Sequence, residues 1–321
     1  MRIALHIANR RMVIPFVLLV TVFGCVPWLS IAARSQTPTS RRVLGQPFVA
    51  NLWLPAAKDR SAGVLVVGGS GGGIAWQDYW GEILSRQGFG ALALAYFGME
   101  GLPKELDEIP LEYCLSALEY MQRQSEIDPT RIGVLGVSKG GELALLLASE
   151  APAIRAVVAF VPSSVVFQSG VSMEAGQKPR SSWTLHGRPL PFVPREAGGA
   201  EEPLVNEFRR ALRQRDHVAK ATIPVEKIHG PILLLSGRED TTWPSTFMSE
   251  MIIARLRQRK FRFSHEHIAY DDAGHMIHQI RSDAVKRGGT EVGNSVAQED
   301  ARRRTLAFLA RTLGAAGDKS R

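Results

Sequence analysis

Short apolar blocks alternate with longer amphipathic stretches along most of the chain. Runs of five or six apolar residues, rich in valine, leucine and alanine, are each followed by a stretch in which apolar residues recur every three or four positions. Continuous apolar runs are typical of parallel strands buried on both faces, and the longer spacing is typical of amphipathic helices. The pattern therefore predicts a mostly parallel central sheet with helices on both faces.

The predicted elements can be placed from the residues where these runs begin and end. The helix over Leu111 to Gln124 has the clearest pattern, because Leu111, Leu115, Leu118 and Met121 form one apolar stripe. In chain order, we predict an edge strand over Pro47 to Leu54, a strand over Gly63 to Val67, a helix over Ile74 to Gln87, a strand over Ala91 to Tyr96, the helix over Leu111 to Gln124, a strand over Ile132 to Val137, a helix over Gly140 to Ser149, and strands over Ala156 to Val161 and Pro231 to Leu235. This alternation predicts an α/β fold.

The two ends of the chain lie outside the predicted fold. Residues 1 to 35 contain Arg10 and Arg11 followed by an apolar run from Val13 to Ala33, which is the layout of an export signal. A run of about 20 uncharged residues is also long enough for an uncleaved membrane anchor. We therefore expect a periplasmic, extracellular or membrane-anchored protein, or a cytoplasmic one if the segment is not a functional signal. Residues 36 to 62 are expected to form a linker, polar from Ser35 to Gly45, and the edge strand, and residues 316 to 321 a tail.

Composition supports a globular protein and excludes some partners. The chain is 45% hydrophobic and 22% charged, close to the averages of globular proteins. Its net charge of +8 is spread over many segments and accompanies no nucleic-acid-binding motif, so no nucleic acid partner is expected. Cys25 and Cys114 lie in very different contexts, so no disulfide framework follows. Cys114, in a helical pattern, is predicted to be a small buried residue.

A serine motif follows the strand that ends at Val137. Gly136, Val137, Ser138, Lys139 and Gly140 fit the pattern glycine, any, serine, any, glycine between a predicted strand and a predicted helix. In that setting the serine occupies a tight turn with its hydroxyl exposed, and the flanking glycines allow the two backbones to approach. Ser138 is therefore our candidate nucleophile, with a helix N-cap as the alternative.

Two backbone donors are expected for an oxyanion at this serine. The N–H of Lys139 is the first, because the residue after the nucleophile has this role in such turns and lies at a helix N-terminus. The second is expected in the loop from Gly68 to Gly73, where Ser70 or Gly71 is the candidate. A glycine-rich loop can also bind phosphate, but no Gly-Lys-Ser/Thr follows here and the dinucleotide-binding glycine spacing fails at Ile74. We therefore do not expect this loop to bind a nucleotide.

A base and an acid follow downstream in the order that this chemistry requires. Leu233 to Leu235 is a buried run that leads to a turn ending at Asp240, and His275 stands in a second turn after Gly274. A serine hydroxyl needs a base to remove its proton and a carboxylate to orient that base. Serine, then aspartate, then histidine is the chain order of the α/β-hydrolase fold, so we predict that fold with Ser138, Asp240 and His275 as a catalytic triad.

Neighbouring residues offer alternatives for two of these roles. Glu239 and Asp272 could replace Asp240, although Asp272 is close enough to His275 in sequence to stabilise its turn instead. His278 could share a helical face with His275. The stretch from Pro162 to about Glu202 is rich in Ser, Gly and Pro, and it could form part of a lid or acyl pocket or a poorly ordered surface segment.

Several segments resemble the acyl-CoA thioesterases and bile acid-CoA:amino acid N-acyltransferases, specifically their C-terminal catalytic domain. The resemblance extends from about Gly63 to about Leu313. It rests on the residues 69–73, 93–97, 102–104, 111–113, 136–142, 223–226 and 240–243, which read GSGGG, ALAYF, LPK, LEY, GVSKGGE, IPVE and DTTW. It implies an α/β-hydrolase domain that cleaves acyl thioesters through an acyl-enzyme, with no metal and no organic cofactor.

The chain departs from that family in ways that keep other functions open. The family usually carries an amino-terminal β-sandwich, of which only Pro47 to Leu54 could be a remnant. Its amino acid conjugating members tend to use cysteine, so Ser138 favours hydrolysis over an acyltransferase reaction. CoA thioesters belong to the cytoplasm, so an exported enzyme would need another thioester or ester. The basic residues around Arg209 and Arg213 could bind CoA phosphates or form a solvated helix face. A third possibility is a non-catalytic, membrane-tethered binding protein on the same scaffold.

Overall fold

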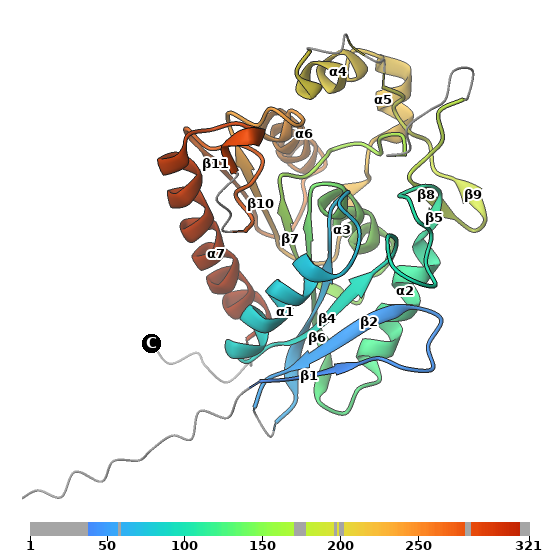
Figure 1. The fold of residues 1–321 in the computed structure, drawn as a ribbon, viewed down its shortest axis with the longest axis vertical. Helices are drawn as coiled ribbons and strands as arrows, with labels where there is room; N and C mark the ends of the chain where they lie inside the picture. Colours follow the sequence, from blue (N-terminus) through green and yellow to red (C-terminus); the bar gives the residue numbers. More distant parts are fainter. Residues whose placement is uncertain are drawn as a thin grey trace, which may run out of the picture. The chain divides into compact units, whose positions relative to one another are not determined.

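An eight-stranded sheet forms the centre of the protein (Figure 1). The computed structural model describes residues 38–56, 59–169, 178–195, 198, 202–279 and 284–314. The strands β3, β4, β6, β7, β10 and β11 run parallel, and β1 and β2 are antiparallel to their neighbours. Across the sheet, the order is β1 (Thr39–Arg42), β2 (Val49–Leu54), β4 (Gly90–Ala95), β3 (Ser61–Val67), β6 (Ile127–Val137), β7 (Ile154–Phe160), β10 (Ile232–Gly237) and β11 (His265–Tyr270).

Helices cover both faces of this sheet, as the sequence predicted. In β3, Val64 and Val66 pack on one face with α1 (Ala75–Arg86) and α7 (Glu291–Leu313). Leu65 and Val67 point to the opposite face, which α2 (Leu111–Gln122), α3 (Lys139–Glu150) and α6 (Ser245–Gln258) cover. Successive side chains of a strand point to opposite faces, so the continuous apolar runs fill two cores.

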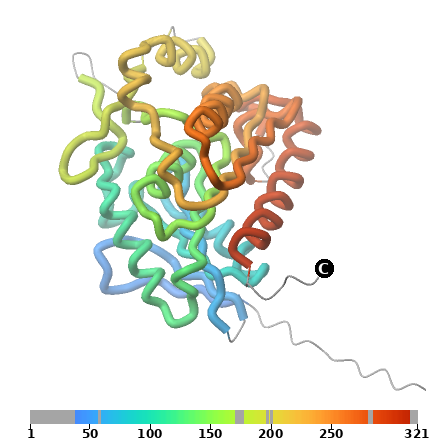
Figure 2. Tube along the Cα trace, turned by 180° about the vertical axis from the view of Figure 1, so that it is seen from behind, coloured from blue at the N-terminus to red at the C-terminus, as the bar shows by residue number. Residues whose placement is uncertain are grey.

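The remaining elements lie outside the central sheet and the helices that cover it. A small second sheet contains β5 (Ile109–Pro110), β8 (Trp183–Leu185) and β9 (Arg188–Pro189). The helices α4 (Leu204–Ala211) and α5 (Arg215–Ala221) lie together at one end of the molecule in both views (Figures 1 and 2). Two 3₁₀ turns, η1 (Val225–Lys227) and η2 (Ala284–Arg287), connect to β10 and α7.

The amino-terminal edge of the sheet differs from the prediction. Thr39–Arg42 was expected to belong to a linker, but these residues form β1, which pairs with β2 from Thr39 opposite Leu54 to Arg42 opposite Asn51. Consequently β2 is not the edge strand. All four β1 residues are exposed, so the strand depends on backbone pairing and has no apolar pattern to reveal it.

The structure settles some of the smaller predictions and leaves others untested. Cys114 is fully buried in α2, as predicted, and burial raises the pKa of its thiol. In the described residues no helix is both long and apolar enough to cross a bilayer. The predicted signal or anchor over residues 1 to 35 and the tail lie outside the described residues, so these remain predictions.

Candidate active site

Ser138 lies at the turn between β6 and α3, at the carboxyl edge of the sheet. Its φ of 55° and ψ of −120° are unusual for a residue with a side chain, and its N–H is held by a 2.9 Å hydrogen bond to the Phe160 carbonyl of the next strand. Such backbone conformations persist only where the surroundings enforce them. Ser138 makes no side-chain capping bond with α3, so the N-cap alternative is not how its hydroxyl is used.

Two glycines allow this turn to form. A Cβ at Gly136 would lie 2.0 Å from the Gly140 carbonyl oxygen, and one at Gly140 would lie 2.1 Å from the Gly68 carbonyl oxygen. Both distances are far below van der Waals contact with backbone that cannot move independently. The glycines therefore have the packing role that the sequence predicted, and they bring the glycine-rich loop after β3 against the turn.

Asp240 stands after β10 with its carboxylate almost completely enclosed by donors. One oxygen accepts the N–H groups of Thr242 at 2.9 Å and Trp243 at 3.2 Å, and the other accepts the Ser245 hydroxyl at 2.6 Å. The Asp240 side chain is 2% exposed. Hydrogen bonds to a carboxylate are among the stronger ones in proteins, so the side chain is held in one orientation.

His275 is fixed by backbone bonds on both sides of its turn. Its own N–H donates to the Arg287 carbonyl at 3.0 Å, and the N–H of Gly274 donates to the Asn294 side chain of α7 at 2.9 Å. A Cβ at Gly274 would lie 2.2 Å from the Gly288 carbonyl oxygen, so only glycine allows this approach. The turn is thus clamped between η2 and α7.

The three predicted side chains come together although they are far apart in the chain. His275 Nδ1 lies 2.8 Å from Asp240 Oδ2, and His275 Nε2 lies 3.1 Å from Ser138 Oγ. An ionised carboxylate only accepts hydrogen bonds, so Nδ1 carries the proton and Nε2 has a free lone pair for the serine hydroxyl. All three residues are buried. The arrangement can remove a proton from Ser138 and stabilise the imidazolium that forms.

The alternative acids and the second histidine lie elsewhere. Glu239 and Asp272 are exposed, and the backbone carbonyl of Asp272 accepts the N–H of Thr290. His278 lies in a turn, not on a helix shared with His275, and the two rings are 6.4 Å apart. His278 Nδ1 accepts the indole N–H of Trp76 at 2.9 Å. This bond ties the histidine turn to α1.

A cavity of about 930 Å³ opens beside Ser138. Ser70 and Gly71, the candidates for a second oxyanion donor, line it, and Gly69 approaches Ser138 most directly, since its Cβ would lie 3.3 Å from Ser138 Cβ. The first N–H groups of α3, beginning with Lys139, have no partner within the helix, as at every helix start. Which group of the loop would meet an oxyanion stays a prediction.

The charged side chains that line this cavity are cations. None of the described residues that line it is an aspartate or a glutamate, while Lys286 and Arg287 of η2 are exposed at its wall. Neither cation forms an ion pair within the described chain. Arg209 and Arg213 line a neighbouring cavity of about 550 Å³ instead, together with Glu250. The described residues contain no group of three or more side chains suited to hold a metal ion.

Three residues of this site could not be found from the sequence motifs. Ser245 donates to Asp240, the Trp243 ring packs edge-on against the His275 ring with centroids 6.1 Å apart, and Asn294 holds the histidine turn. Trp243 belongs to the segment 240–243 that carries the family resemblance, but the motif assigns it no contact with His275. A serine five residues after an acid and an asparagine in a helix carry no recognisable signal.

Solved structures place this architecture in a known fold class. A dienelactone hydrolase-like promiscuous phosphotriesterase from metagenomic libraries aligns over 87% of this chain and 100% of its own, with a TM-score of 0.58 and 13% identity. An acylaminoacyl peptidase of Pyrococcus horikoshii aligns over 88% of this chain and 43% of its own, with a TM-score of 0.56 and 12% identity. The protein has the α/β-hydrolase fold, as the sequence predicted.

Sequence comparison then identifies the family. Residues 109–315 match the family model described as BAAT / Acyl-CoA thioester hydrolase C terminal, and the chain belongs to this family. Acyl-coenzyme A thioesterase 1 of Homo sapiens is 30% identical over 299 residues, which cover 89% of this chain and 67% of that protein. Peroxisomal succinyl-coenzyme A thioesterase of Mus musculus is 29% identical over 286 residues, 83% of this chain and 63% of that protein. The chain therefore matches between 55% and 67% of the length of such relatives.

Proposed function

We propose that the protein is a serine hydrolase that cleaves acyl thioesters through an acyl-enzyme intermediate. The observation that supports it best is the continuous chain of hydrogen bonds from Asp240 through His275 to Ser138, at 2.8 Å and 3.1 Å. A serine held at a strained turn beside a histidine of fixed tautomer is the arrangement that acyl transfer needs. Membership of a family described by acyl-CoA thioester hydrolysis supports the same reaction.

In the proposed reaction, Ser138 Oγ attacks the thioester carbonyl carbon while its proton passes to His275 Nε2. Asp240 stabilises the imidazolium through Nδ1. The oxyanion is held by the Lys139 N–H and by a donor of the loop that contains Ser70 and Gly71. The carbon–sulfur bond then breaks, and the thiol leaves with the proton from His275. Water repeats the sequence, with His275 as its base, and releases the acid and the free serine.

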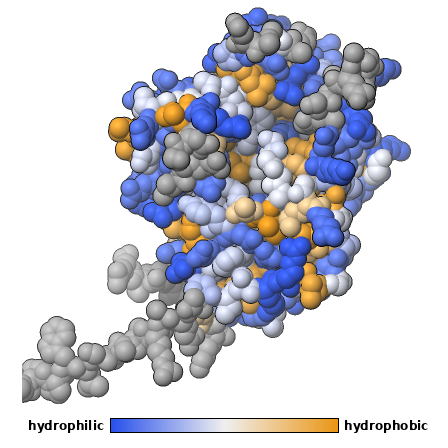
Figure 3. Space-filling model, in the orientation of Figure 1, coloured by the Kyte–Doolittle hydropathy of each residue, from blue (hydrophilic) through white to orange (hydrophobic). Residues whose placement is uncertain are grey.

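The charge of the cavity supports CoA as the thiol half of the substrate. CoA carries a diphosphate and a 3′-phosphate, which favour lysine and arginine side chains. Lys286 and Arg287 line the cavity that contains Ser138, and no described carboxylate side chain lines it. Two of the relatives are named as acyl- or succinyl-coenzyme A thioesterases. Figure 3 shows the hydropathy of the face seen in Figure 1, where hydrophobic patches lie among hydrophilic residues.

The direct test is thiol release by the purified protein. Acyl-CoA esters of several chain lengths, acyl-pantetheine thioesters and nitrophenyl esters should be compared, with a fluorophosphonate as a label for Ser138. We expect turnover and labelling in the wild type and loss of both in Ser138→Ala, with kcat lower by about a thousandfold or more. Normal turnover by Ser138→Ala would refute the mechanism. An acyl-glycine or acyl-taurine product in the presence of those amines would indicate an acyltransferase instead.

A further inference from the structure

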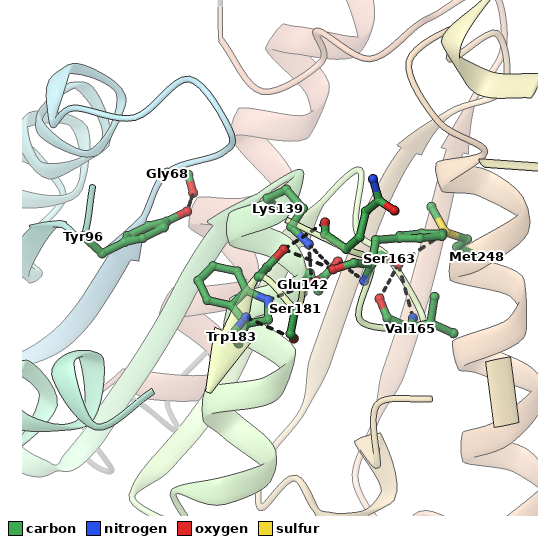
Figure 4. Close-up of polar contacts among 12 residues, drawn as sticks. Gly68, Tyr96, Lys139, Glu142, Ser163, Val165, Ser181, Trp183 and Met248 are labelled. Carbon is green, nitrogen blue, oxygen red and sulfur yellow. Dashed lines mark hydrogen bonds and ion pairs between the residues drawn. The ribbon is translucent and has the colours of Figure 1, made fainter. Parts of the chain in front are cut away.

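A buried ion pair lies directly behind the candidate nucleophile. Lys139, the residue after Ser138, extends its ammonium to Glu142 Oε1 at 2.5 Å and to the Phe167 carbonyl at 3.3 Å (Figure 4). Glu142 is fully buried, and Lys139 is 7% exposed. Lys139, whose backbone N–H is the predicted oxyanion donor, thus has its side chain fixed against the segment that follows β7.

Glu142 also binds the insertion between β7 and α4. Its Oε1 accepts the indole N–H of Trp183 at 2.7 Å, and its Oε2 accepts the N–H of Phe167 at 3.4 Å. The Ser182 hydroxyl donates to the same Phe167 carbonyl that Lys139 contacts, at 3.1 Å. One carboxylate therefore joins α3 to two stretches of the insertion. In Figure 4 the Trp183 ring points to Glu142 from β8.

The same cluster reaches the glycine-rich loop. The Tyr96 ring packs against the Trp183 ring with centroids 5.7 Å apart, and the Tyr96 hydroxyl donates to the Gly68 carbonyl at 2.5 Å. Gly68 in turn contacts the turn at Gly140. The cluster thus touches both stretches of backbone from which oxyanion donors are expected.

Stability alone is a poor explanation for such a pair. Burial raises the pKa of Glu142 and lowers the pKa of Lys139, so each group is pushed towards its neutral form. A buried ion pair often stabilises a protein no better than apolar residues of similar size would. What the pair does provide is a fixed orientation of both side chains, because two charged partners with additional hydrogen bonds allow one geometry.

We propose that the Lys139–Glu142 pair, held by Trp183, is a positioning device that keeps the Lys139 peptide aimed at the oxyanion of the reacting thioester. The proposal rests on the proposed function, because it concerns the oxyanion donor of that reaction. Lys139 and Glu142 act through the backbone N–H of Lys139, and their side chains do not touch the substrate. The insertion is then part of the catalytic apparatus through Trp183 rather than a surface excursion.

The test separates positioning from stability by removing both charges at once. Glu142→Gln leaves a lone buried ammonium, so it should lower both the melting temperature and kcat. Lys139→Met/Glu142→Gln leaves no uncompensated charge, so the melting temperature should recover, but kcat should stay about tenfold to a hundredfold below wild type because the peptide is no longer tethered. KM for the thioester should change by no more than about twofold. Trp183→Phe, which loses the indole N–H together with part of the buried ring, should lower kcat in the same direction.

Ser163→Ala is the matched control, because Ser163 is fully buried in the same insertion and, among the described residues, its hydroxyl bonds only with Val165 and Met248 (Figure 4). It should keep the wild-type kcat. The rate of fluorophosphonate labelling should follow kcat in every variant. A double variant with wild-type kcat, or kcat that recovers together with the melting temperature, would overturn the proposal. If the double variant does not fold, an unchanged kcat in Trp183→Phe would overturn the proposal instead. An inactive and unlabelled wild type would instead refute the proposed function.

Discussion

Neutralising the two cations of η2 is a sharp test of which thioester the site accepts. Lys286 and Arg287 line the cavity beside Ser138, and both side chains are exposed and without an ion-pair partner in the described chain. Lys286→Gln/Arg287→Gln should therefore remove attraction for phosphates without disturbing the fold. The hydrogen bonds that tie this turn to His275 and Thr241 use the Arg287 carbonyl, which the substitution retains.

The expected size of the effect follows from the exposure of the two side chains. An ion pair that stays in contact with water contributes about 0.2 to 1 kcal/mol, well below the value for a buried one. Two such contacts to CoA phosphates would together contribute about 0.4 to 2 kcal/mol. Since about 1.4 kcal/mol corresponds to a factor of ten, KM for an acyl-CoA should rise roughly 2- to 30-fold. The value of kcat should hardly change, because the phosphates are remote from the reacting carbonyl.

The assay is thiol release at low and at moderate salt with two substrates that share one acyl group. Acyl-CoA should show the rise in KM, and the rise should shrink as salt screens the wild-type attraction. Acyl-pantetheine, which lacks the phosphates, should show no change. Arg209→Gln/Arg213→Gln, which alters the neighbouring cavity, serves as the control and should leave KM for both thioesters unchanged. An equal loss with both thioesters, or a loss only in the control, would refute the assignment of the phosphates to η2.

Three further substitutions test the site and the fold. Gly140→Ala should prevent correct folding of the serine turn, because the new Cβ would lie 2.1 Å from the Gly68 carbonyl oxygen. Soluble yield and fluorophosphonate labelling measure the misfolding, and a soluble, fully labelled variant would contradict the packing argument. Ser245→Ala removes the 2.6 Å hydrogen bond to Asp240, so kcat should fall about tenfold to a hundredfold with KM unchanged in steady-state assays, since a bond to a charged group contributes about 1.5 to 3 kcal/mol. His267→Gln should make stability depend less on pH. Burial lowers the pKa of His267 from 6.5 to about 4, so the unfolded chain binds an extra proton as the pH falls from 6.5 to 4. The wild type should therefore lose about 1 kcal/mol of unfolding free energy between pH 7 and pH 5, after allowance for the partial exposure of His267. Urea unfolding at both pH values measures this loss, and an identical loss in the variant would exclude His267 as its source.

The sequence predicts the buried part of the fold and misses elements whose buried faces are polar or small. The strands β3, β4, β7 and β10 lie in the interior of the sheet and have continuous apolar runs, so they were predicted to within two residues. The interior strand β6 was predicted only in its apolar second half, and it begins at Ile127, five residues before the predicted start. The helix α7 was not predicted. Its buried face includes Asn294, Ala297, Gln298 and Thr305, so apolar periodicity is weak there. The strands β1 and β11 have exposed or half-buried side chains, and pairing with the neighbouring strand determines them more than hydrophobicity does.

The candidate site divides in a similar way, and the division has a physical cause. Ser138, Asp240 and His275 could be predicted because each follows a strand of the parallel sheet, so the fold itself brings the ends of β6, β10 and β11 to one edge. Their supporting contacts depend instead on segments whose approach no local pattern encodes. Glu142 meets Trp183 only because the insertion folds back onto α3, 41 residues away in the chain. Chemistry that is local to strand ends can therefore be read from order and spacing, whereas the contacts that hold it in place require the tertiary structure.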